Sequence, residues 1–208
     1  MEEMKEKELV REIKNEITSY EIPELKKLFI HTNLSTRKFQ KIWANWWETG
    51  IPPRLEVDMI FVFKENTPFE NVFLVGVEVE YFRDRRKNYY DGLQQILSFG
   101  LFGFDSLVLW HIFSENLDNK FVGECVKPVR EIIEGFNIPI VYLATRITDN
   151  KEFEFYYPLK LFSSLKVNAR DLVVNLNELC MTKRNPLLDK NEVEKRKKTM
   201  KLILKIPM

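Results

Sequence analysis

Glycine is scarce in this chain of 208 residues, which contains only 7. Loops that cradle phosphates need glycine, and because neither GxGxxG nor GxxxxGK[ST] occurs, the sequence argues against both kinds of nucleotide-binding loop. The 2 cysteines, Cys125 and Cys180, are too far apart to predict a disulfide framework or a cysteine-based zinc site. The 2 histidines, His31 and His111, have no metal-ligand neighbour in the sequence and are interpreted as structural residues.

Long hydrophobic runs and an excess of charge of one sign are also missing. No apolar stretch approaches the roughly 20 residues that span a bilayer, and the N-terminal MEEMKEKELVREIK lacks the apolar segment of a signal peptide. We therefore expect a cytoplasmic protein without membrane contact. The 32 basic and 31 acidic residues exclude a uniformly basic nucleic-acid coat. Basic charge is concentrated locally, with four basic residues and one acidic residue in 83–87, and nine basic and three acidic in 183–208.

Hydrophobic residues make up 45% of the chain, which has the length of one folded domain. Helical spacing and strand alternation of the apolar residues predict an α/β fold, a central mixed β-sheet flanked by helices. Residues 28–30 are a short apolar run that predicts either a strand or the start of a loop. The predicted helices are 2–18, 36–47, 88–102, 120–135, 168–181 and 189–204, and the predicted strands are 54–63, 72–82, 105–113, 138–144 and 152–156.

Three carboxylates interrupt the apolar pattern of two successive strands. Asp58 lies in the first, and Glu78 and Glu80 lie in the second. Burying a carboxylate is costly unless something pairs with it, so acids in this setting suggest a function. If the strands form a hairpin in the register that places Asp58 opposite Glu78, all three side chains point to one side of the sheet. Converging carboxylates are the ligands that Mg²⁺ prefers, and a bound cation activates water.

This order of elements resembles the PD-(D/E)xK nuclease superfamily. In that superfamily an Asp in one strand is followed by a hairpin and by Glu-x-Lys in the next strand. A helix that often carries a Gln and an apolar strand then follow, as Gln95 and the stretch 104–109 do here. The resemblance covers about residues 5–145 and implies a restriction endonuclease-like core at 1–145. Residues 146–208 are then a mainly helical extension, with a basic final helix packed on the core.

The resemblance also implies roles for individual residues. Asp58 and Glu78 would bind Mg²⁺, with Mn²⁺ as a substitute, and Glu80 would bind the metal or act as a general base. Gln95 would hold a metal-bound water or a phosphate, with Gln94 as the alternative, and Glu12 would be the acid of the first helix. The basic residues after the second strand would contact nucleic acid, DNA by preference: Arg83, Arg85, Arg86 and Lys87. The resemblance implies a phosphodiester hydrolase, and it implies a homodimer because cutting two strands needs two sites.

The sequence departs from the family pattern at Glu80, which replaces the superfamily's lysine, and a cation from 83–87 is one substitute for it. Three alternatives remain open. The protein is a catalytically silent relative that binds nucleic acid or another protein, or Glu78 and Glu80 lie on the solvated face of an edge strand. The third is an unrelated α/β protein that works by protein contact through its aromatic segments. The tryptophans of the predicted helix 36–47 have helical spacing, which favours a buried stripe over such a contact surface: Trp43, Trp46 and Trp47.

Overall fold

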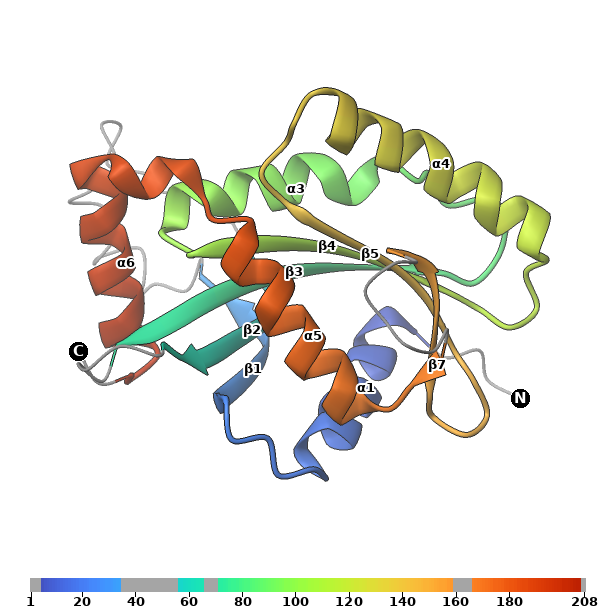
Figure 1. Cartoon of the computed structure of the whole chain (residues 1–208), viewed down its shortest axis with the longest axis horizontal. Coiled ribbons are helices and arrows are strands. Elements are labelled where there is room, and N and C mark those ends of the chain that lie inside the picture. The colour runs from blue at the N-terminus through green and yellow to red at the C-terminus, as the bar shows by residue number, and fades with distance from the viewer. Residues whose placement is uncertain (1–4, 35–55, 66–70, 159–165, 207–208) are drawn as a thin grey trace.

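The computed structural model describes residues 5–34, 56–65, 71–158 and 166–206. They form an α/β fold with a seven-stranded mixed sheet flanked by helices (Figure 1), which confirms the predicted class. The predicted tryptophan helix at 36–47 lies outside the described residues. None of the helices within these ranges is long and apolar enough to cross a membrane.

The strands follow one another across the sheet in chain order, from β1 to β7. The inner strands β3, β4 and β5 are parallel, and antiparallel pairs extend the sheet on both sides. Every residue of β4 is buried, as expected for a strand covered on both faces. The bounds are β1 Leu25–Asn33, β2 Glu56–Lys64, β3 Val72–Phe82, β4 Ser106–Phe113, β5 Val141–Ile147, β6 Phe153–Tyr157 and β7 Lys166–Val167.

Among the described residues, helices cover both faces of the sheet (Figure 1). The crossover helices α3 (Asp91–Phe99) and α4 (Asn119–Gly135) bury their apolar residues in a first core on one face of the sheet. Phe82 of β3 belongs to this core, and Glu78 and Glu80 lie on the same face of β3 as Phe82. On the opposite face, α1 (Glu6–Thr18) and α5 (Ala169–Thr182) form a second core. The short 3₁₀ segments are η2 (Gly100–Phe102) and η3 (Pro186–Asp189).

Residues beyond 145 are continuous with the rest of the sheet. The predicted boundary lies inside β5, and β6 and β7 add two further strands, one more than the single strand predicted at 152–156. The basic helix α6 (Asn191–Ile203) packs on the first core through Met200. Its Lys197 also forms an ion pair with buried Asp105, at the start of β4.

β1 differs most from the expected secondary structure. The short apolar run at 28–30 is the centre of a nine-residue strand, Leu25–Asn33, that pairs along its length with β2. The sequence does not predict this strand in full, because Lys26, Lys27 and His31 break the apolar alternation. The pairing also carries an irregularity between Leu25 and Lys27, which disturbs the two-residue period further.

Candidate active site

The β2–β3 hairpin adopts the register that brings the three carboxylates together. Met59 pairs with Val77, so the next position places Asp58 opposite Glu78. A shift of one residue would have turned these side chains to opposite faces. Glu78 and Glu80 are only 5% and 7% exposed, and β3 is an inner strand. The alternative of a solvated edge strand is therefore wrong.

β2 and β3 separate immediately after this pair, and carboxylates take over the backbone hydrogen bonds of β3. The amide of Val79 donates to Asp58 Oδ2 at 2.9 Å, and the amide of Tyr81 donates to Glu6 Oε2 at 3.0 Å. Buried amides need such partners once a neighbouring strand has ended. Backbone satisfaction thus accounts for the positions of Asp58 and Glu6, but it does not require Glu78 or Glu80.

Lys87 joins the cluster from the connection between β3 and α3. Its Nζ lies 2.5 Å from Glu80 Oε2 and 2.5 Å from Glu6 Oε2. Burial alone would lower the pKa of Lys87, but its hydrogen bonds with Glu6 and Glu80 raise that pKa by more, so the side chain carries a positive charge. A cation therefore lies beside Glu80, the position at which the sequence resemblance leads one to expect a lysine.

Helix α3 closes the site from the side of the first core. Gln95 donates from Nε2 to Glu78 Oε2 at 2.9 Å, so Gln95 rather than Gln94 reaches the carboxylates. Gly92 makes the close approach of α3 feasible. A Cβ atom there would lie 2.7 Å from Glu80 Cγ, closer than ordinary van der Waals contact. One of the few glycines in the chain thus lies against the cluster.

Burial and mutual repulsion make the carboxylates reluctant to ionise. Desolvation is the largest cause at each of the three acids, and it raises the pKa of Asp58 to about 7 and that of Glu78 to about 10. At Glu78, the nearby charges of Asp58, Glu80 and Glu6 add to this effect. The pKa of Glu80 is also raised by burial, against the opposing effect of Lys87. The positive charge of Lys87 therefore does not balance the four acids Glu6, Asp58, Glu78 and Glu80. A further cation would stabilise the cluster.

The chemistry of these donors fits a hard divalent cation. Carboxylate oxygens are the ligands that Mg²⁺ and Mn²⁺ take, and the contacts described above use one oxygen each of Asp58, Glu78 and Glu80. Across the described ranges, no three His, Cys, Asp or Glu side chains already converge in a metal-binding arrangement. The carboxylate donors and the repulsion between them therefore fit a bound cation. To bind it, the side chains of Asp58, Glu78 and Glu80 would have to rotate toward a common point.

The basic residues of the loop after β3 lie in two places. Arg83, Arg86 and Lys87 line one hollow, where Lys87 is also part of the cluster and Arg86 forms a surface ion pair with Asp84. Arg85 instead pairs with Asp118 at the start of α4 and lies over the ring of Phe121. Three of the four residues predicted to contact nucleic acid thus line one hollow, and Arg85 lies outside it.

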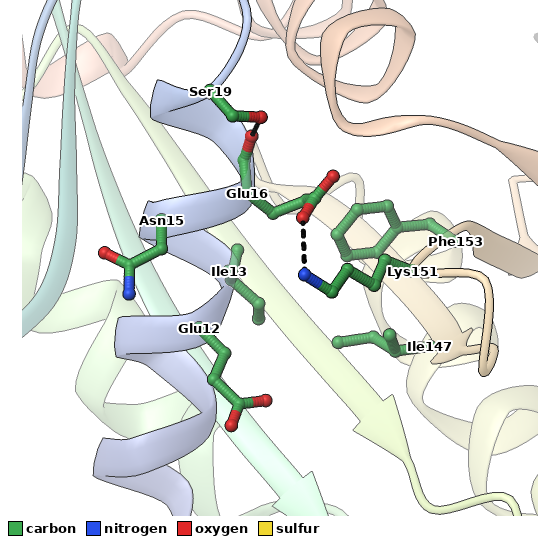
Figure 2. A pocket seen from close by; sticks show the side chains of 8 residues that line it. All are labelled: Glu12, Ile13, Asn15, Glu16, Ser19, Ile147, Lys151 and Phe153. Atoms are coloured by element: carbon green, nitrogen blue, oxygen red, sulfur yellow. Dashed lines mark hydrogen bonds and ion pairs between the residues drawn. The ribbon is translucent and has the colours of Figure 1, made fainter.

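The structure does not bring Glu12 to the cluster. Glu12 lines a separate hollow of about 420 Å³ between α1 and the β5–β6 turn, where Glu16 pairs with Lys151 (Figure 2). The acid of the first helix that reaches the cluster is Glu6, which lies six residues before Glu12 and contacts Lys87. The sequence analysis missed Glu6 because acids are common in the first turn of any helix. No pattern in the sequence distinguishes it.

Comparison with known proteins identifies no relative. No protein-family model, curated protein or solved structure matches the chain.

Proposed function

We propose that this protein is a metal-dependent nuclease with a restriction endonuclease-like core of the PD-(D/E)xK type. Its substrate would be DNA, hydrolysed at internal phosphodiester bonds. The observation that carries the proposal is the cluster of buried acids near the carboxyl end of β3, in which Gln95 contacts Glu78 and Lys87 contacts Glu80. In open α/β sheets, that end of the strands is where ligands bind.

Each residue of the cluster has a role in this proposal. Asp58 and Glu78 would hold Mg²⁺, which supplies a Lewis acid and lowers the pKa of bound water. Glu80 accepts a proton or adds a ligand, and its raised pKa suits a general base. Lys87 supplies the positive charge that the superfamily places at position 80, and it stabilises the phosphate as negative charge develops. Gln95 fixes the Glu78 carboxylate.

A catalytically silent relative that binds nucleic acid or another protein is the second candidate. It is favoured by the ion pairs that Lys87 makes with both Glu80 and Glu6, because this ammonium group already occupies a position that a metal would compete for. In that case the cluster is a structural device and no divalent ion is needed. The two candidates differ in whether Mn²⁺ binds and whether DNA is cut.

The test is a cleavage assay on plasmid and branched DNA with Mg²⁺ or Mn²⁺, together with calorimetric titration of Mn²⁺. We expect cleavage by the wild type and a loss of at least about a hundredfold in Glu78→Gln, since even contacts behind the metal ligands contribute about 10–100-fold. Glu12→Gln is the matched control, because it makes the same chemical change on an acid outside the cluster.

Two results would overturn the nuclease proposal. One is the absence of cleavage by the wild type with either ion, and the other is equal cleavage by Glu78→Gln. If the protein binds DNA but neither cleaves it nor binds Mn²⁺, the result favours the catalytically silent relative. If the protein is a homodimer that cuts both strands, as the family resemblance suggests, linearised plasmid should form without prior accumulation of the nicked circle.

A further inference from the structure

We propose that the hollow beside the carboxylate cluster is a binding site for a backbone phosphate of a nucleic-acid strand. The choice of a polynucleotide as ligand rests on the proposed function. The hollow has a volume of about 500 Å³, which falls in the range of about 300–1,000 Å³ typical of ligand sites. It is lined by Lys5, Glu6, Tyr81, Arg83, Asp84, Arg86 and Lys87.

The hollow and the cluster share two residues. Glu6 and Lys87 line the hollow and also form the ion pair that faces Glu80. A phosphate bound there would lie against the Lys87–Glu6 ion pair, on which Glu80 also lies. A strand held by one phosphate in the hollow would therefore pass next to Asp58, Glu78 and Glu80, the position that cleavage requires.

The charges in the hollow match a phosphate. Four of its residues are basic and two are acidic, and Glu6 is already engaged with Lys87. Asp84 pairs with Arg86 at 3.1 Å, but the Arg86 side chain is 90% exposed, and exposed ion pairs of this kind are weak. An arriving phosphate can therefore compete for Arg86, because guanidinium groups bind phosphate oxygens bidentately.

A basic site in this position also answers an electrostatic difficulty. The ionised acids of the cluster repel a phosphodiester, so an acidic site that acts on nucleic acid needs positive charge nearby to hold the strand. The hollow provides that charge on the side of the cluster formed by α1 and the end of β3. Lys5 comes from the N-terminal end of α1, and both arginines come from the loop after β3.

The loop contains its own control for this inference. Arg83 and Arg86 line the hollow, whereas Arg85, between them in sequence, pairs with Asp118 outside it. Replacing any one of the three by alanine removes one positive charge from the same short segment. A specific phosphate site distinguishes the three variants, and a diffuse basic surface does not.

The experiment measures binding of a fluorescein-labelled 20-nucleotide DNA by anisotropy in EDTA, at several salt concentrations. We expect Arg83→Ala and Arg86→Ala each to weaken binding by about tenfold, the loss of one charge-assisted contact, and to reduce the salt slope by about 1. Arg85→Ala should bind as the wild type does. Inorganic phosphate and a DNA with neutral methylphosphonate linkages separate the ligand sources, and the methylphosphonate DNA should bind the wild type more weakly than either arginine variant binds normal DNA, because it loses both contacts.

Equal weakening in all three variants would overturn the inference, as would no weakening in any, or binding of inorganic phosphate without binding of DNA. Cleavage measured on the same variants with Mg²⁺ separates this inference from the proposed function. Cleavage and binding at wild-type levels in Arg83→Ala and Arg86→Ala refute the phosphate site and leave the nuclease intact. Binding that depends on these arginines, in a wild type that never cuts DNA, supports the site and refutes the nuclease.

Discussion

Lys87 is the residue on which both the stability and the chemistry of the cluster depend. It is the partner of two partly or fully buried carboxylates, and Glu80 and Glu6 would lose their ion pair without it. The residue lies seven positions beyond Glu80, in a connection between β3 and α3 that has no regular structure. Residue 80 is thus a glutamate, and the lysine next to its side chain comes from position 87 instead.

Replacing Lys87 by methionine should abolish cleavage and strengthen Mn²⁺ binding, because a competing cation is removed. The free energy of unfolding in EDTA should fall by about 1–3 kcal/mol, the cost of leaving polar groups without partners, at the lower end because the lysine is a quarter exposed. Denaturant unfolding and Mn²⁺ titration measure the two effects. Lys7→Met is the control, because Lys7 also pairs with a glutamate but lies on the surface. Weaker Mn²⁺ binding in Lys87→Met would contradict this account.

The sequence identified the cluster residues whose setting was unusual and missed those whose setting was ordinary. Asp58, Glu78 and Glu80 were predicted because acids interrupt apolar strands, and the hairpin pairing placed them together. Glu6 lies in the first turn of a helix, where an acid is unremarkable, and the family resemblance points to Glu12 instead. The contacts of Lys87 depend on the path of the chain through an irregular connection, which no periodicity encodes.

Helix α3 is positioned by the absence of a side chain at Gly92. An added Cβ would lie 2.7 Å from both Glu80 Cγ and Leu109 Cδ1, so Gly92→Ala must move the helix or one of these two side chains. We expect a loss of about 1–3 kcal/mol in unfolding free energy and a marked fall in cleavage. Gly123→Ala in α4 is the matched control, with no atom within 4 Å of the added Cβ.

The control should be neutral or stabilising by up to about 1 kcal/mol, because alanine favours helix more than glycine does. Thermal unfolding and a cleavage assay measure both variants. If Gly92→Ala cleaves DNA as the wild type does, the contact between α3 and Glu80 has no part in the site.

Helix α6 is anchored by a buried ion pair. The Asp105 carboxylate is 3% exposed, accepts a hydrogen bond from the amide of Leu74 and pairs with Lys197. Lys197→Met should lower the free energy of unfolding by about 3–5 kcal/mol, because it leaves a buried charge unpaired. Adjacent Lys198→Met should cost about 0–1 kcal/mol, since Lys198 pairs with Glu194 on the surface. Urea unfolding measures both, and the double variant Asp105→Asn with Lys197→Met should recover most of the loss.

At the scale of elements, strong periodic patterns were predicted well and mixed patterns were not. The central strands and the helices on both faces follow from apolar runs and amphipathic spacing. β1 escaped full prediction because lysines interrupt it, and its length is set by pairing with β2 rather than by its own pattern. β7 is only two residues long, which is too short for any periodicity to be visible.

The whole molecule should become less stable as the pH rises when no metal is present. The pKa values of Asp58 and Glu78 are raised on folding to about 7 and about 10, so the folded state binds more protons than the unfolded state above the ordinary carboxyl pKa. Stability therefore declines with pH from about 4 upward, until each folded pKa is passed. We expect the melting temperature in EDTA to fall between pH 5 and pH 9, and the double variant Asp58→Asn with Glu78→Gln to show a flatter dependence.

Added Mg²⁺ or Mn²⁺ should reverse this loss. A bound cation stabilises the ionised carboxylates, so the rise in melting temperature should be larger at pH 8 than at pH 5, where protons compete with the metal. Differential scanning calorimetry at the two pH values measures the difference. An equal shift at both, or no shift at either, would contradict a metal site at the cluster.

The separation of β2 from β3 beyond the Met59–Val77 pair has one more consequence, which concerns how the site can be observed. Beyond that point, the amides of Val79 and Tyr81 donate to the carboxylates of Asp58 and Glu6 instead of to a neighbouring strand. The resonances of these two amides in a ¹⁵N-labelled sample therefore report directly on the charge of the acids that they contact. These two backbone amides of β3 thus allow protonation of the acids, metal binding and binding of a nucleic-acid strand to be followed without a cleavage reaction.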